Sequence, residues 1–256
     1  MTDLLGFVGL FVAAVAAGAL NAVAGGGSLI SFPALVAFGQ PAILANATNT
    51  AALWPGSLSS ALAYRRDTLM HRELLVVLLL PSLLGGLLGA LVLVNTPPDL
   101  FDRVVPFLVA FATVLFAARD VIGRWTKAHA RGEEHVGWAG KVWGFWFQLF
   151  VATYGGYFGA GIGILMLAAL SIMGLTDIHE MNSLKVVFGG SINGIAAAYF
   201  IWAGMVQWTD VLVMAIAAIL GGWGGAGTAR RIGRTAVRRI VVGLGFVMAI
   251  SLFIKK

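Results

Sequence analysis

The sequence lacks cysteine altogether and is poor in charge. None of its 256 residues is a cysteine, which excludes disulfides, thiolate metal sites and cysteine nucleophiles. Only 11% of the residues are charged, too few to cover the surface of a soluble domain of this length. Hydrophobic residues make up 59%, and the mean hydropathy is +0.92. The sequence therefore predicts an all-α polytopic membrane protein, with most of its surface facing lipid and no separate soluble domain.

Carboxylates are also missing from the predicted membrane interior. All eleven acidic residues lie in loops or within a turn of a helix end, which removes the usual cation ligand and proton relay. The four histidines are equally peripheral and show no metal-ligand spacing. A membrane-embedded enzyme would have few groups to work with, so we predict transport rather than catalysis, with no metal and no cofactor. Proton coupling through His179 or Glu180 stays open.

Ten apolar segments follow one another along the chain. Two of them, 28–38 and 160–174, are shorter than the ~20 residues that a membrane span needs, and each follows a glycine cluster. We expect each break to join two helices into a hairpin that returns to its starting face. No positive charge precedes the first segment, so we expect it to remain rather than be cleaved as a signal peptide. The predicted segments are 4–24, 28–38, 42–64, 73–94, 101–119, 138–154, 160–174, 177–202, 208–228 and 236–254.

The two halves of the chain share one pattern. A glycine cluster, a short helix, a Gly and a long helix with a Gly-Ser pair recur about 135 residues apart: Gly56 precedes Gly190 by 134 positions, and Gly89 precedes Gly225 by 136. Chance similarity of glycine-rich membrane helices is the alternative. We predict two repeats, 1–120 and 138–256, joined by a cytoplasmic linker at 121–137, each a broken-helix hairpin plus three transmembrane helices.

Positive charge orients the repeats. If the second is inverted, thirteen Lys and Arg within 65–72, 119–141 and 230–239 lie on the cytoplasmic face, and three, Arg103, Lys255 and Lys256, lie on the other. With eight simple crossings the division is ten against six. The net charge of +6 then reflects orientation rather than nucleic-acid binding. We predict inverted repeats in the cell membrane with both termini outside, although Lys255 and Lys256 argue against it.

One charge falls inside a predicted span. Lys185 lies about two turns into its helix, and a cation there is a candidate counter-charge for an anion. The alternative is that its stem extends to the membrane surface, a distance of ~12 Å. The first half carries polar residues at the matching place, which either contact a ligand or hold helices together. The candidates on these two helices are Asn46, Thr48, Asn49, Thr50, Asn182, Ser183 and Lys185.

The glycine breaks supply a second candidate feature. Non-helical backbone at membrane depth is tolerated only where protein or a water-filled cavity satisfies it. The short helix after each break begins inside the protein, so its free N–H groups and positive dipole end favour an anion. Close helix packing is the alternative explanation for such glycines. The candidates are Asn21, Gly25, Gly26, Gly27, Ser28, Gly159, Gly161 and Gly163.

These motifs resemble the sulfite exporter TauE/SafE family over nearly the whole chain. The first half carries Asn21-Ala-Val-Ala-Gly-Gly-Gly-Ser28, Pro33, Asn46-Ala-Thr-Asn-Thr50 and Pro55-Gly56. The second carries Gly156-Tyr-Phe-Gly-Ala-Gly-Ile-Gly163, Asn182-Ser-Leu-Lys185 and Gly189-Gly190. The resemblance implies a permease of duplicated halves that moves sulfur-containing or organic anions, with the glycine, Asn/Thr and Asn-Ser-x-Lys motifs lining its pathway.

We therefore expect a transporter, in the exporting direction, for a small anion such as sulfite or sulfoacetate, working by alternating access around a midplane site. A passive, channel-like exporter and a membrane enzyme are the alternatives. The expected partners are the anion and membrane lipid, with no nucleic acid. The glycines at 85–89 and 221–225 permit close packing within the chain or in a homodimer. Substrate, direction, coupling ion and oligomeric state stay open.

Overall fold

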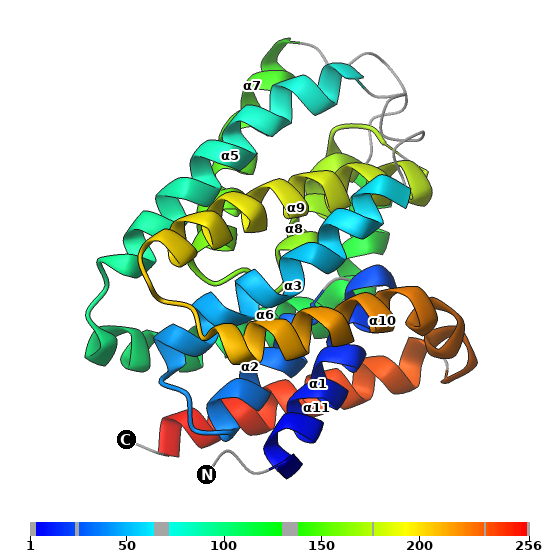
Figure 1. The fold of residues 1–256 in the computed structure, drawn as a ribbon. Coiled ribbons are helices and arrows are strands. Elements are labelled where there is room, and N and C mark those ends of the chain that lie inside the picture. The colour runs from blue at the N-terminus through cyan, green and yellow to red at the C-terminus, as the bar shows by residue number, and fades with distance from the viewer. Residues whose placement is uncertain are drawn as a thin grey trace.

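The computed structural model describes residues 4–23, 26–63, 72–129, 138–175, 177–232 and 234–254, and every regular element in these ranges is helical (Figure 1). The all-α class is thereby confirmed. The helices are α1 (Leu4–Val23), α2 (Ser28–Ala37), α3 (Ala42–Ala63), α5 (Arg72–Val94), α6 (Pro98–His129), α7 (Trp138–Tyr157), α8 (Ile162–Ile172), α9 (Ile178–Trp202), α10 (Trp208–Ile232) and α11 (Arg234–Ile254).

The helix bounds follow the apolar segments closely, with one correction. α6 continues ten residues beyond the predicted segment 101–119, so residues 121–129 of the predicted linker 121–137 are helical. Hydropathy falls there, but backbone hydrogen bonds of a helix do not require apolar side chains, and Arg and Lys are good helix formers. Val121 and Trp125 on this extension are more than half exposed. The repeat boundaries at 120 and 138 stay predictions.

The helices of the two halves pack in matching pairs. α1 lies mainly against α10, and α5 lies mainly against α7, so each pair joins the first half to the second. α3 and α9 pack on one another in the middle of the bundle, and α6 packs on α11 (Figure 1). The helices α1, α2, α3, α5 and α6 of the first half correspond in order to α7, α8, α9, α10 and α11 of the second. When corresponding helices are exchanged, each of these contacts becomes itself or another contact of the set. A duplicated unit explains such matching; the inversion of its copies relative to a membrane stays a prediction.

The long helices give the bundle two ends. At the Ala63 end, α3 and α10 end while α5 and α9 begin; at the Ala42 end, α3 and α10 begin while α5 and α9 end (Figure 1). Thr48 lies beside Gln207 and Gly56 beside Ala218, which shows that α3 and α10 run in the same direction. α1 begins and α11 ends on the side of the Ala42 end (Figure 1).

The outer surface of the bundle is apolar. Val76 of α5 is 72% exposed and Phe150 of α7 is 70% exposed, as befits side chains that face hydrocarbon rather than water. Three of the described helices have the length and apolar composition to cross a membrane: Arg72–Val94, Pro98–Trp125 and Ile178–Trp202. Most polar side chains with low exposure lie instead between helices, where they bond to backbone or to each other.

Candidate functional site

The first helix break lies between α1 and α2. Gly26 has a φ of +104°, a conformation that side chains with a Cβ rarely adopt, so the chain turns there at little cost. Asn21, in the last turn of α1, accepts a 2.7 Å hydrogen bond from the backbone N–H of Gly27. This bond satisfies a backbone donor that the break would otherwise leave unpaired. Gly25 lies outside the described residues.

The second break lies between α7 and α8 and has a similar construction. Gly159 and Gly161 have φ values of +79° and +83°, and Gly161 directly precedes α8. The Tyr154 hydroxyl of α7 donates a 2.8 Å hydrogen bond to the carbonyl of Ala160 inside the break. Each break is therefore held by a polar side chain from the helix before it.

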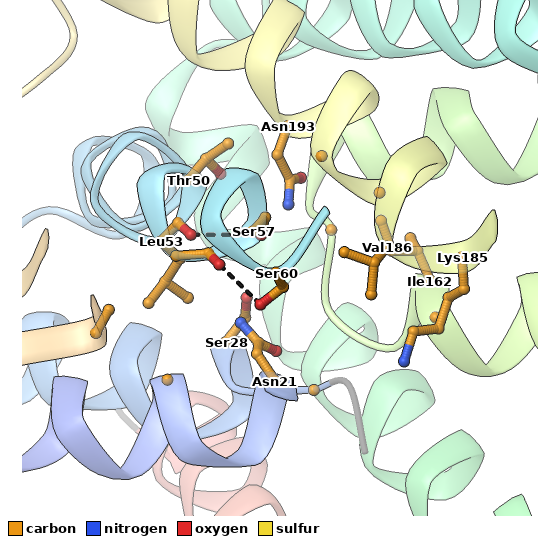
Figure 2. A pocket seen from close by; sticks show the side chains of 18 of the residues that line it. Asn21, Ser28, Thr50, Leu53, Ser57, Ser60, Ile162, Lys185, Val186 and Asn193 are labelled. Carbon is orange, nitrogen blue, oxygen red and sulfur yellow. Dashed lines mark hydrogen bonds between the residues drawn. The ribbon is translucent and has the colours of Figure 1, made fainter. Parts of the chain in front are cut away.

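The two breaks face a single cavity. It encloses about 870 Å³, including the open space at its mouth, and α1, α2, α3, α8, α9 and α10 contribute to its wall (Figure 2). Eight of the residues predicted for the site line it, namely Asn21, Gly26, Ser28, Thr50, Gly159, Gly161, Gly163 and Lys185. The folding of the chain thus brings both glycine motifs, one Thr and the buried Lys to one place.

Lys185 is the positive charge of this wall. Its side chain is 5% exposed, and its ammonium donates a 2.8 Å hydrogen bond to Oδ1 of Asn182, one turn earlier in α9. Arg119 of α6 lies close enough to act on it electrostatically. No carboxylate is among the described residues that line the cavity. Lys185 is thus buried within the protein and bonded toward the start of α9; its role as a counter-charge for an anion stays a prediction.

The position of Lys185 is fixed by the start of its helix. Asp177 caps α9 and accepts hydrogen bonds from the backbone N–H groups of His179 and Glu180, at 2.6 and 3.2 Å. These two bonds lower the pKa of the Asp177 carboxyl below its ordinary value, because they stabilise the charged form. Lys185 then follows two turns later, on the face of α9 that carries Val186, Gly189 and Asn193 to the cavity.

Several predicted site residues bond elsewhere rather than lining the cavity. Asn49 accepts a hydrogen bond from the Ser31 hydroxyl, which joins α3 to α2. Thr48 accepts one of 3.1 Å from the backbone N–H of Gln207, and Asn46 donates one of 2.8 Å to the Tyr157 carbonyl. For these three residues the structure shows the helix-joining role that the sequence left open. Ser183 bonds to the Glu180 carbonyl within α9, at 2.8 Å.

Gly27 packs inward instead. A Cβ built on it would lie 2.3 Å from the carbonyl oxygen of Ala17, so only glycine fits this close approach between the break and α1. Its N–H is the group bound by Asn21. Gly27 therefore shapes the cavity wall without being part of it.

Three polar residues of the wall were missed by the sequence analysis. Ser57 and Ser60 of α3 line the cavity below Thr50, and Asn193 of α9 lies across from them (Figure 2). The signal was present: positions 50, 53, 57 and 60 follow helical spacing, so they share one face of α3. The polar face of α3 that includes Thr50 therefore continues beyond the Pro55-Gly56 pair to Ser60.

Among the described residues, no group of three or more His, Asp or Glu side chains is placed to hold a metal ion. The wall instead combines backbone, hydroxyl and amide groups with a single ammonium and the apolar side chains of Leu53, Phe158 and Met166. Such a wall can bind and orient a small polar solute, and it contains no pair of groups arranged for acid–base catalysis.

A helical membrane bundle with a polar cavity at two helix breaks is the architecture of a membrane transporter. Comparison with known proteins agrees: the chain belongs to the sulfite exporter TauE/SafE family, whose family model matches residues 10–252. The resemblance noted from the motifs is thereby confirmed.

The relatives cover nearly all of the chain. It is 28% identical over 240 residues to a probable membrane transporter protein of Haemophilus influenzae, an alignment that spans 93% of this chain and 91% of the relative. It is 30% identical over 248 residues to the probable membrane transporter protein ORF9 of a Sinorhizobium species, with 95% and 90% covered. Probable membrane transporter protein YfcA of Escherichia coli is 26% identical over 249 residues, with 95% and 88% covered. No solved structure matches the chain significantly.

Proposed function

We propose that this membrane transporter moves a small anion, a sulfur oxyanion or an organosulfonate such as sulfite or sulfoacetate. The observation that carries the proposal is the buried Lys185 ammonium in a cavity whose described wall has no carboxylate. Water screens charges poorly in such a place, so the ammonium attracts an anion and repels a cation more strongly than it would at the surface. The family description, which names sulfite export, supports the same class of substrate.

The wall supplies groups that suit the oxygens of such an anion. Lys185 provides the charge, and the hydroxyls of Ser28, Thr50 and Ser57 line the same cavity. In this state the hydroxyls of Thr50 and Ser57 donate to carbonyls of α3, and they would turn to bind an anion. The starts of α2 and α8 add the positive ends of two helix dipoles. We assign these groups to substrate binding, and we assign the helix-joining Asn46, Thr48 and Asn49 to the support of the site.

Export is the proposed direction, across the cell membrane by a multi-pass protein. The membrane potential favours exit of an anion by about 2.3 kcal/mol per charge per 100 mV, so no buried proton carrier is required. Alternating access is the proposed mechanism. A passive, channel-like exporter is the second candidate, because the same potential would drive it; saturation and counterflow separate the two.

The decisive experiment is uptake into proteoliposomes of purified protein, with radiolabelled sulfite, sulfate, thiosulfate and sulfoacetate offered separately. We expect saturable flux of one of these anions. Lys185→Ala removes the charge that the anion meets and should lower flux at subsaturating substrate by roughly 30-fold or more. Arg124→Ala is the control, because it removes a positive charge from the exposed end of α6, away from the cavity.

Equal flux in Lys185→Ala and the wild type would contradict the role of Lys185. Absence of flux for all four anions, with cations or neutral solutes transported instead, would contradict the anion proposal. Flux that does not saturate and shows no counterflow would select the channel-like exporter over alternating access.

A further inference from the structure

We propose that Asn46 and Asn182 are paired gate residues. Asn46 closes the Ala42 end in the state seen here. Asn182 closes the Ala63 end once the Lys185 ammonium, which binds Asn182 here, binds an anion instead. The role of Asn46 rests on the structure alone, whereas the anion-dependent role of Asn182 rests on the proposed function. Here a gate residue is one whose hydrogen bond joins the two halves across the pathway.

The Ala42 end is held together by side-chain bonds between the two halves. Asn46 of α3 donates to the Tyr157 carbonyl at the end of α7, at 2.8 Å. Thr48 of α3 accepts from the N–H of Gln207, just before α10, and Gln40 bonds to Asp210 in the first turn of α10. Asn46 is 1% exposed and Thr48 is fully buried. These bonds shut the space between the halves on this side of the breaks.

The cavity begins where these bonds end and extends the other way. On α3 its wall runs from Thr50 to Ser60, three residues before the helix ends, and on α10 it includes Ala218 and Gly222. At ~1.5 Å per residue, Thr48 and Ser60 are ~18 Å apart along the helix. Among the described residues, the cavity is therefore bounded at the Ala42 end and extends toward the Ala63 end.

Asn46 and Asn182 occupy equivalent places. They are 136 positions apart, as are the first residues of α3 and α9 and the pair Gly89 and Gly225; the pair Gly56 and Gly190, 134 apart, lies two positions off this register. Each stands three residues before another polar residue of its motif, Asn49 or Lys185. Their helices, α3 and α9, pack on one another, and the pairs α1–α10 and α7–α5 correspond in the same way. The counterpart of the end of α7, which Asn46 binds, is the last turn of α1.

The two asparagines differ in what holds them. Asn46 is buried and bonded to the opposite half, whereas Asn182 is half-buried and its Oδ1 accepts from Lys185 of its own helix. An anion offers the ammonium a charged acceptor, and such bonds are roughly twice as strong as those to a neutral amide. Once Lys185 turns to the anion, Asn182 is released to bind the end of α1, and the Ala63 end closes behind the substrate.

The absence of cysteine makes the proposal directly testable. Ser60→Cys places a single thiol in the cavity wall, and its reaction with a membrane-impermeant maleimide is timed from each side of oriented vesicles. In the otherwise unchanged protein we expect labelling from one side, and we expect sulfite or sulfoacetate to slow it. Adding Asn46→Ala should raise the labelling rate from the other side by roughly fivefold, the effect of one lost hydrogen bond. Adding Asn182→Ala should abolish the slowing by the anion.

Two further variants keep the test decisive. Asn46→Leu keeps the branched shape of Asn, with the same number of side-chain heavy atoms, but lacks the donor, so a folded protein should behave as Asn46→Ala does. Asn95→Ala is the matched control, because Asn95, just after α5, is exposed and its side chain donates to the Leu91 carbonyl of that helix; it should change neither rate.

The outcomes separate the gate from the substrate. Labelling from the second side in neither Asn46 variant overturns the role of Asn46, and anion protection that persists in Asn182→Ala overturns the role of Asn182. If Asn46→Ala opens the second side but no anion slows labelling in the unchanged protein, the Asn46 gate stands while the anion-dependent step and the proposed function both fail.

Discussion

The polar residues of this protein divide into those that line the cavity and those that join helices. Thr50 lines the cavity while Asn49, its neighbour, bonds to Ser31, because successive residues of a helix point about 100° apart. The charge balance of the wall then depends on single positions. Among its described residues, Lys185 is the one that carries a charge, so a new carboxylate there should have a large effect.

Asn193→Asp tests this balance. Lys185 and Asn193 are about 12 Å apart along α9, and two charges at that distance interact by about 1.4 kcal/mol at an effective dielectric of about 20, which corresponds to roughly tenfold in affinity. The new carboxylate should offset part of the Lys185 charge and repel an anion, so anion uptake should fall more than in Asn193→Ala. Concentration-dependent uptake measures the change. An Asp variant no weaker than the Ala variant would show that charge does not govern binding.

At the scale of helices, glycines set how closely the two halves approach. A Cβ on Gly89 of α5 would lie 2.1 Å from the Thr153 carbonyl oxygen of α7, and one on Gly221 of α10 would lie 2.0 Å from the Val15 carbonyl oxygen of α1. These glycines therefore serve packing within the chain, at the two matching interfaces between halves. Gly89 and Gly221 are therefore covered within the chain and are not available to a homodimer.

Gly89→Ala should destabilise the protein by about 1–3 kcal/mol, because the extra methyl group forces α5 away from α7. Thermal unfolding in detergent, followed by helicity, measures the loss. Gly243→Ala in α11 is the control: a methyl group added there would meet nothing within 4 Å, so that variant should be neutral or stabilised by up to ~1 kcal/mol. Equal stability of the two variants would show that the α5–α7 contact is looser than described.

At the scale of the whole molecule, the helices place basic residues unevenly. Arg124 lies on the extension of α6 at the Ala63 end, the end at which the sequence places most of its Lys and Arg. Positive residues remain on the cytoplasmic side of membranes. In the predicted orientation, the end toward which the cavity extends faces the cytoplasm, the side from which the proposed exporter takes its substrate.

Cysteine scanning tests this orientation. Arg124→Cys should react with an impermeant thiol reagent from the cytoplasmic side alone, and Asn95→Cys, in the turn between α5 and α6, from the outside alone. Tags on the two termini should both be reached from the outside. Reaction of Arg124→Cys and Asn95→Cys from the same side would contradict the orientation and the inverted repeats with it.

Local patterns in the sequence determine much of this architecture. Long apolar runs determine helices because lipid leaves backbone groups no other partner, and glycine clusters determine where two of those helices break. The family could also be recognised from the motifs at 21–28, 46–50, 156–163 and 182–185, since each motif is a short continuous stretch of the sequence.

Only the tertiary structure decided what the polar residues do. Asn46 meets Tyr157, 111 positions away, and Thr48 meets Gln207, 159 positions away, and no local pattern determines such partners. The contribution of Ser60 and Asn193 to one wall likewise depends on how α3 packs against α9. Helical spacing predicts which residues share a face, but the packing of the whole bundle determines what that face contacts. The same packing therefore determines which polar residues line the cavity and which ones bond between helices at its closed end.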